Sequence, residues 1–322
     1  MHRRSALSLV LTGVVATLAA GMAATLISRR QVPKAILSEA EALALYSSPG
    51  AAPVAPRSVF HLGHSLVGRD IPVMVAQLAG QGHVFHSQLG WGASLKNHWG
   101  PVDDISGFVS ENSHSNARLA TQAIDSGLYD AVVFTEMVDI RDAIRYHESA
   151  KYLFRWAARA RKANPNVAIY FYETWPNTND AEGWLERVDK DLPRHWEREI
   201  LLPAVRADGR PIYVIPGGQA LSAMVRAIIA RGGIDGVTRV EDFFALAADG
   251  TQDTIHLNDL GAYVIAVTHY AVLYQSNPIG LPNALLRADG SAAKAPGQEL
   301  ANIIQQTVWD IVTAYDKTGV SA

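Results

Sequence analysis

The feature that most constrains the fold of this chain is a regular alternation of short apolar segments with longer amphipathic ones, beginning near residue 58. The short segments are rich in β-branched and aromatic side chains, which favours strands, whereas the longer ones repeat apolar residues with helical spacing. Several predicted strands are almost continuously apolar, as is typical of a parallel sheet covered by helices on both faces. Strands are predicted at 58–62, 83–88, 130–134, 168–173 and 211–215, and helices at 71–81, 116–126, 146–162, 181–205, 219–231, from about 259, and at 299–315.

The residues before position 58 are expected to lie outside this body. Residues 5–28 carry no charged side chain and follow Arg3 and Arg4. As a helix this run is about 36 Å long, enough to cross a hydrocarbon core of about 30 Å. We therefore predict a signal anchor, or alternatively a cleaved signal peptide, over 1–30. A linker over 31–57, rich in proline towards its end, then leads to a folded domain over 58–322.

The composition excludes several classes of function. The 322 residues include 28 lysines and arginines against 31 aspartates and glutamates, and a net charge of −3 gives no sign of a nucleic-acid-binding surface. There is no cysteine, so thiolate nucleophiles, disulfides and cysteine-ligated metal sites are excluded. A nucleophile in this chain must therefore be Ser, Thr, Asp, Glu, Lys or a metal-bound water.

Ser65 is the first candidate nucleophile because it comes just after the first predicted strand, where the carboxyl ends of parallel strands gather reactive groups. A free serine hydroxyl is a weak nucleophile and needs a general base within hydrogen-bond reach. His256 supplies such a base, and Asp253, on the same predicted loop before the helix from about 259, can orient its ring. Each motif alone also fits a simple turn or a helix cap. Their order along the chain, with βα units between them, favours a Ser-His-Asp triad.

With these residues the chain resembles the SGNH hydrolases, also called GDSL-type esterases and lipases. Gly63-His64-Ser65 is similar to the first block of that family, and Asp253-x-x-His256 is similar to its last block. The resemblance covers about 58–275. It implies an α/β fold, a flavodoxin-like three-layer αβα sandwich with a mostly parallel central sheet, and ester hydrolysis without a cofactor. The Gly-x-Ser-x-Gly signature of the α/β-hydrolases is absent.

The resemblance also implies an oxyanion hole, which the family builds from three donors. The first is the serine N–H, here of Ser65. The second is a glycine N–H after the second strand, for which Gly90 and Gly92 are the candidates, and Gly90 is preferred because it directly follows the strand. The third is an asparagine side chain after the third strand, and at that place this chain has none. Thr135 is the first candidate to replace it through its hydroxyl group, and a protonated Glu136 and Asn97 are the alternatives.

Other side chains at the predicted strand ends are candidates for binding substrate. Asn97 lies on the second strand-end loop, and Glu136 follows Thr135. An ionised Glu136 beside an oxyanion is unfavourable, so this side chain either points elsewhere or has a raised pKa. Trp91 and Trp175 also fall on strand-end loops, where an aromatic face either stacks on a sugar ring or acyl chain or plugs the loop structurally. No metal site is predicted, because the histidine pairs spaced i,i+3 fall in strands and turns and lack a third ligand.

The leading interpretation is a membrane-anchored or exported serine esterase that hydrolyses small acyl esters, with O-acetyl groups on glycans as one candidate substrate. The two N-terminal arginines favour a cytoplasmic N-terminus, which places the catalytic domain in the periplasm behind a single pass of a bacterial-type inner membrane. Cleavage of the segment instead predicts a secreted protein. Two alternatives stay open: an O-acyltransferase acting on envelope glycans, and a catalytically degenerate SGNH-like module that binds carbohydrate.

Overall fold

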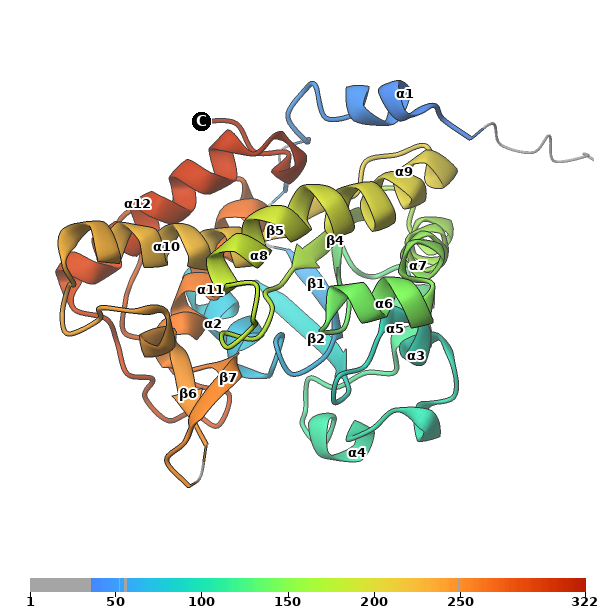
Figure 1. Cartoon of the computed structure of the whole chain (residues 1–322). Coiled ribbons are helices and arrows are strands. Elements are labelled where there is room, and N and C mark those ends of the chain that lie inside the picture. Colours follow the sequence, from blue (N-terminus) through green and yellow to red (C-terminus); the bar gives the residue numbers. More distant parts are fainter. Residues whose placement is uncertain (1–35, 52, 55–56, 248) are drawn as a thin grey trace, which may run out of the picture. The chain divides into compact units, whose positions relative to one another are not determined.

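The centre of the molecule is a five-stranded parallel sheet. The computed structural model describes residues 36–51, 53–54, 57–247 and 249–322. The strands lie in the order β2-β1-β3-β4-β5 (Figure 1), which is the order of flavodoxin-like doubly wound folds. Their bounds are Ser58–Gly63 (β1), Val84–Leu89 (β2), Ala131–Thr135 (β3), Ala168–Glu173 (β4) and Tyr213–Pro216 (β5). The predicted α/β fold with a parallel central sheet is confirmed.

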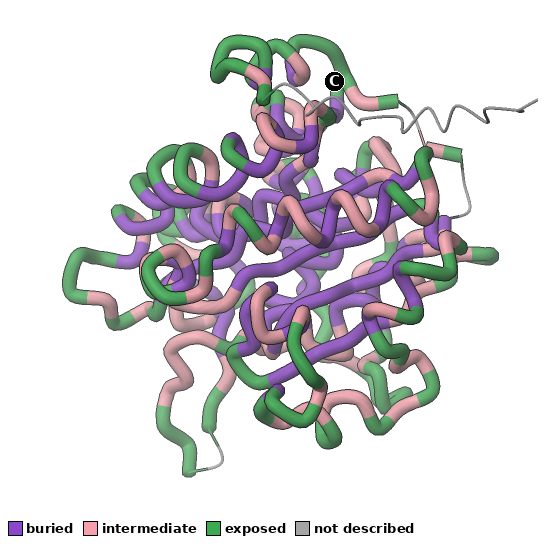
Figure 2. Tube along the Cα trace, turned by 90° about the vertical axis from the view of Figure 1, so that its right-hand side faces the viewer, coloured by how far each residue is buried: buried purple, intermediate pink, exposed green. Residues whose placement is uncertain are grey.

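Helices cover both faces of this sheet, and each face has its own cluster of buried apolar side chains. Figure 2 shows the strands and the inward sides of the helices as buried. One cluster is completed by α2 (Asp70–Ala79), α8 (Trp184–Asp191), α10 (Gly217–Arg231), α11 (Asp259–Tyr274) and α12 (Gln298–Ala314). The other is completed by α1 (Glu39–Ala44), α3 (Leu95–Trp99), α5 (Ala120–Asp125), α6 (Ile140–His147), α7 (Ser149–Ala163), a π-helical segment η2 (Leu192–Leu201) and α9 (Leu202–Asp208).

The parallel pairing of the strands brings their carboxyl ends to one edge of the sheet. In β1 and β2, Gly63 lies beside Leu89, and in β4 and β5, Glu173 lies beside Pro216. All four neighbouring pairs are parallel, so the residues that follow each strand emerge on the same side of the sheet. The connection after β2 contains the 3₁₀ turn η1 (Val102–Asp104) and the short helix α4 (Phe108–Glu111). Two further 3₁₀ turns lie elsewhere, η3 (Val240–Phe243) before β6 and η4 (Asp316–Thr318) after α12.

Part of the segment that the sequence predicts as a linker belongs to the body. Helix α1 begins with a capping box in which Ser38 and Glu41 bond to each other's backbone N–H. Tyr46 follows this helix and is buried, and its hydroxyl group donates a hydrogen bond to the carbonyl oxygen of Ile212 at 2.8 Å. The folded body therefore starts before residue 58. The anchor predicted over 1–30 lies outside the described residues, and among those that are described no helix is long and apolar enough to cross a bilayer.

A small antiparallel hairpin stands apart from the main sheet. It consists of β6 (Phe244–Leu246) and β7 (Gln252–Leu257), and β7 carries both Asp253 and His256. The prediction of a loop for these residues is therefore wrong. The hairpin escaped prediction because β7 is half-exposed along its length and shows no alternation of apolar and polar side chains. At its end, Asn258 caps α11 by accepting hydrogen bonds from the N–H groups of Leu260 and Gly261.

Candidate active site

The structure brings Ser65, His256 and Asp253 together, although Ser65 is separated from the other two by most of the body. The hydroxyl oxygen of Ser65 lies 3.0 Å from Nε2 of His256, and Nδ1 of the same ring lies 2.8 Å from Oδ2 of Asp253. With the ring proton on Nδ1, Ser65 donates to His256 and His256 donates to Asp253. This is the geometry in which an imidazole can accept the proton of a serine hydroxyl.

The Asp253 carboxylate is held in its charged form. Burial alone raises its pKa, but hydrogen bonds from the backbone N–H groups of His256 and Ile255 and from the His256 ring outweigh burial and leave the pKa below its usual value. Those two N–H groups reach Oδ1 at 2.9 and 2.8 Å. Because Oδ1 is used by the backbone, Oδ2 remains free to face the imidazole. The side chain of His256 is 46% exposed, so the ring stands at the opening of the site.

The turn that presents Ser65 is fixed by two buried histidines. His64 has Nε2 at 2.8 Å from the carbonyl oxygen of Glu136, and its Nδ1 accepts the N–H of Leu66 at 3.3 Å. His98, on α3, has Nε2 at 2.8 Å from the carbonyl oxygen of Gly63. Burial lowers the pKa of both rings to about 4, so each is neutral and carries a single N–H donor. Sequence reasoning missed His98, since nothing in its neighbourhood distinguishes it from a surface histidine.

Ser65 and His256 open onto a cleft of about 630 Å³. Trp91 is the predicted substrate-binding residue that the structure places in this cleft, with 57% of its surface exposed. Its indole N–H donates to Glu111 at 2.7 Å, and its ring packs so closely on Gly107 that no side chain would fit there. The orientation of the exposed indole is therefore fixed. The cleft is completed by His64, Leu66, Gly92, Val138, Asn177 and Ile255.

The glycine that faces the cleft is Gly92, and the preference for Gly90 is wrong. Gly90 is buried, and its N–H continues the parallel pairing beyond β2 by donating to the carbonyl oxygen of Gly63 at 3.2 Å. Gly92 lines the cleft with a φ of 56°, a conformation that favours glycine. Within the described part of the chain, the N–H groups of Gly92 and Ser65 have no acceptor. These two are the donors that remain for an oxyanion.

Thr135 and Glu136 are not placed to contact substrate, which corrects both predictions. Thr135 is fully buried against Gly63 at the end of β3. Glu136 is fully buried as well, and its Oε1 accepts the N–H groups of Leu95 and Met137 at 3.2 and 2.9 Å. It therefore faces the first residue of α3 rather than the cleft. Burial raises the pKa of Glu136 to about 7.

Asn97 and Trp175 have structural roles instead of the predicted binding roles. The side chain of Asn97 closes the capping box of α3 by accepting from Ser94, and the residue does not line the cleft. Trp175 is buried, and its indole N–H donates to the carbonyl oxygen of Ile255 at 2.9 Å, next to His256. It thus supports the strand that carries the histidine.

Asn177 is a cleft residue that sequence reasoning missed. It lies on the loop after β4, and its Oδ1 accepts the hydroxyl group of Thr254 at 2.9 Å. The only signal in the sequence is its position on a strand-end loop, which it shares with several other polar residues. Among the described residues, no group of three or more histidine, aspartate or glutamate side chains is arranged to hold a metal ion.

The fold and the site together define the class of this protein: a doubly wound α/β domain with a serine–histidine–aspartate constellation at the carboxyl edge of its sheet. Within that class the chain resembles a divergent SGNH hydrolase. The resemblance rests on its own residues, with the serine after β1 and the histidine and aspartate just before α11.

Neither a family model nor a curated protein matches the sequence. Among solved structures the chain is similar to a carbohydrate esterase family 3 from Talaromyces cellulolyticus, at 17% identity over 68% of this chain and 97% of that chain, with a TM-score of 0.38. It is similar to a GDSL-like lipase from Parabacteroides merdae, at 12% identity over 68% and 95% of the two chains and a TM-score of 0.41. An acetyl esterase mutant with acetate ion gives 18% identity over 68% and 97%, with a TM-score of 0.35.

Proposed function

We propose that this protein is a serine esterase that hydrolyses small acyl esters. The observation that carries the proposal is the contact of 3.0 Å between the Ser65 hydroxyl oxygen and Nε2 of His256, beside an open cleft of about 630 Å³. The Ser65 oxygen attacks the ester carbonyl carbon while His256 takes its proton. His256 then gives this proton to the leaving alcohol, and an acyl-serine forms. Water, deprotonated by His256, attacks the acyl group, and release of the acid restores Ser65.

Asp253 and two backbone N–H groups support this chemistry electrostatically. The ionised Asp253 fixes the ring tautomer and stabilises the imidazolium that forms in each half of the reaction. The N–H groups of Ser65 and Gly92 are the donors for the oxyanion, because they lie beside the nucleophile and have no acceptor among the described residues. Each donor of this type is worth about 3 kcal/mol of transition-state stabilisation.

An O-acetyl group on a glycan is the substrate that the cleft walls favour. The exposed indole of Trp91, held by Glu111, offers a flat apolar face beside Ser65 on which a sugar ring can stack. The uncharged run over 5–28 supports a membrane-anchored or exported protein with a periplasmic catalytic domain. Transfer of the acyl group to a sugar hydroxyl instead of water uses the same acyl-serine and is the second candidate, since the cleft is open enough to admit an acceptor.

The test is hydrolysis of p-nitrophenyl acetate by the full chain in detergent, compared with Ser65→Ala, His256→Ala and the control Ser115→Ala, an exposed serine that does not line the cleft. Both site variants should lose at least about a thousand-fold in kcat, and the control should lose nothing. Equal rates in all four proteins would refute the esterase and point to a carbohydrate-binding module. A rise in acylated sugar at the expense of free acid, on adding sugar acceptors, would identify the transferase.

A further inference from the structure

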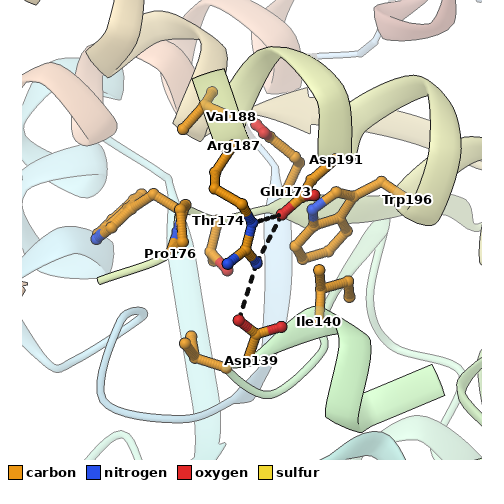
Figure 3. Close-up of a pocket in the computed structure, with 11 residues that line it drawn as sticks. Asp139, Ile140, Glu173, Thr174, Pro176, Arg187, Val188, Asp191 and Trp196 are labelled. Atoms are coloured by element: carbon orange, nitrogen blue, oxygen red, sulfur yellow. Dashed lines mark hydrogen bonds and ion pairs between the residues drawn. The ribbon is translucent and has the colours of Figure 1, made fainter. Parts of the chain in front are cut away.

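A buried arginine lies behind the walls of the cleft. Arg187, on α8, is only 2% exposed and is surrounded by three aspartates from three different segments. Its guanidinium group lies 2.9 Å from Asp139, 2.5 Å from Asp180 and 2.9 Å from Asp191. Figure 3 shows the guanidinium between Asp139 and Asp191.

Two of these aspartates belong to loops that line the cleft. Asp139 directly follows Val138 on the loop after β3, and Asp180 lies three residues after Asn177 on the loop after β4. Asp191 lies one turn further along α8 itself, so it anchors the guanidinium to the helix. Arg187 is thus a common partner of the loops after β3 and β4. The same two loops contribute Val138 and Asn177 to the cleft wall.

Bulk water cannot replace these contacts. The cavity lined by Arg187, Asp139 and Asp191 measures about 10 Å³, at the lower limit for a single water molecule. The side chain of Arg187 is 2% exposed, whereas those of Asp139 and Asp180 are 28% and 21% exposed. A buried guanidinium group is costly when it loses a partner, because little solvent screens its charge. The arrangement of the two loops therefore depends on this group, beside the exposed ion pair of Arg141 with Glu182.

We propose that Arg187 is a positioning residue that clamps the loops after β3 and β4 and thereby holds Val138 and Asn177 in the wall of the substrate cleft. This inference rests on the proposed esterase function. Ser65, Asp253 and His256 lie on other segments, but the loop after β4 bonds to Thr254 on β7 through Asn177 and Thr178. Loosening the clamp should therefore mainly weaken substrate binding, with a smaller effect on the chemical step. The expected signature is a larger change in KM than in kcat.

Two conservative variants test the clamp without changing the size of the side chains. Asp139→Asn and Asp180→Asn each keep the Oδ1 atom that accepts a backbone N–H, from Arg141 at 2.7 Å and from Glu182 at 2.9 Å. They place an amide NH₂ where Oδ2 met the guanidinium, so a charged hydrogen bond becomes a contact between two donors. The matched control is Asp189→Asn on the same helix, whose ion pair with Arg226 is half-exposed and touches neither loop.

The experiment measures kcat and KM for p-nitrophenyl acetate, and amide hydrogen exchange over 136–139 and 174–183, on the full chain in detergent. Both loop variants should raise KM about tenfold with kcat within about twofold and should speed exchange in these two segments, while Asp189→Asn changes nothing. Arg187→Lys, which keeps the positive charge, should raise KM less than Arg187→Met does. Unchanged KM and unchanged exchange, or a fall in kcat at constant KM, would overturn the clamp. If the native protein shows no hydrolysis that depends on Ser65, the esterase proposal is refuted. The hydrogen-exchange data would still decide whether Arg187 clamps the two loops.

Discussion

At the scale of single residues, His64 holds the turn that presents Ser65. Its Nδ1 accepts the N–H of Leu66, as an Asp or Asn oxygen does in an Asx turn. Its second nitrogen also donates to the carbonyl oxygen of Glu136 and so ties the turn after β1 to the turn after β3. The imidazole ring therefore joins two strand-end turns that are far apart in the sequence.

Replacing His64 separates these two contacts. His64→Ala leaves the Leu66 N–H and the Glu136 carbonyl without partners, and we expect a loss of about 1–3 kcal/mol in the free energy of unfolding together with a lower kcat. His64→Asn can still accept the Leu66 N–H, so it should keep more of the activity. Urea unfolding and kcat measured on both variants check this. An asparagine variant that performs no better than alanine would contradict the turn role.

Trp91 and Trp175 look alike in the sequence and should respond differently to substitution. Trp91 is mostly exposed, so Trp91→Ala should leave the free energy of unfolding unchanged and raise KM for an acetylated hexose about fivefold, equivalent to about 1 kcal/mol of stacking. Trp175→Phe leaves the partly buried carbonyl oxygen of Ile255 without its indole partner, so it should cost about 1 kcal/mol of stability and lower kcat through His256. Steady-state kinetics and urea unfolding on each variant distinguish the two patterns, and identical patterns would contradict both assignments.

The site could be predicted from the sequence only as far as residue type and order decide it. Ser65, His256 and Asp253 could be proposed because a nucleophile follows the first predicted strand and a carboxylate and a base precede a late predicted helix. The choice of Gly92 over Gly90 depends on which N–H the sheet register consumes, and the sequence does not specify that register. The inward direction of Glu136 depends in the same way on where α3 begins.

At the scale of elements, Asn258 connects the hairpin of β6 and β7 to α11, the helix that follows it. Its Oδ1 caps α11, and its Nδ2 donates to the carbonyl oxygens of Asp242 and Phe244 at 2.8 and 3.1 Å. Because β7 carries His256 and Asp253, the position of the hairpin sets the position of the ring.

Asn258→Ala removes all four of these hydrogen bonds. We expect a loss of about 1–3 kcal/mol in the free energy of unfolding and a fall in kcat, because His256 loses its fixed distance to Ser65. The control is Asn277→Ala, an exposed asparagine that bonds only to the N–H of Ile279 and should change neither quantity. Loss of stability at full kcat would show that the hairpin is placed by other contacts.

Elements were predictable where burial imposes a pattern. Four strands of the main sheet, β1, β3, β4 and β5, are buried along almost their whole length, and their apolar runs gave positions close to those observed. The hairpin of β6 and β7 has little buried surface, so its sequence lacks such a pattern. Helix α1 escaped notice because its six residues bury a single side chain, Ala42, and its attachment through Tyr46 is a tertiary contact. A short helix of this kind depends on the body and not on its own propensity.

At the scale of the whole molecule, two sets of buried ionisable groups make the free energy of unfolding depend on pH in opposite directions. Burial lowers the pKa of eight of the described histidines, and it does so most strongly for five of them. The pKa falls to about 4 for His64, His83, His98 and His269, and well below its ordinary value for His61. Between pH 4 and 6.5 the unfolded chain therefore binds more protons at these rings than the folded chain does. The free energy of unfolding should fall as the pH falls through this window.

Two buried glutamates give the opposite slope. Burial raises the pKa of Glu136 to about 7 and that of Glu173 to about 8, so the folded chain holds protons that the unfolded chain has already released above its ordinary value of 4.5. Their contribution to stability decreases as the pH rises from about 4.5 towards 8. Below pH 6.5 the five histidines outweigh the two glutamates, and above it only the glutamates remain.

The thermal midpoint should therefore pass through a maximum near pH 6.5 and decline towards pH 8. Glu173→Gln should flatten the alkaline limb, because a glutamine at this place can still accept the N–H of Gly218 and has no proton to release. The control Glu186→Gln, on an exposed ion pair with Lys190, should keep the slope of the native protein. Calorimetry from pH 4 to 9 on the three proteins measures this. A midpoint that stays level or rises between pH 6.5 and 8 in the native chain would mean that Glu136 and Glu173 ionise in the folded state as they do in water.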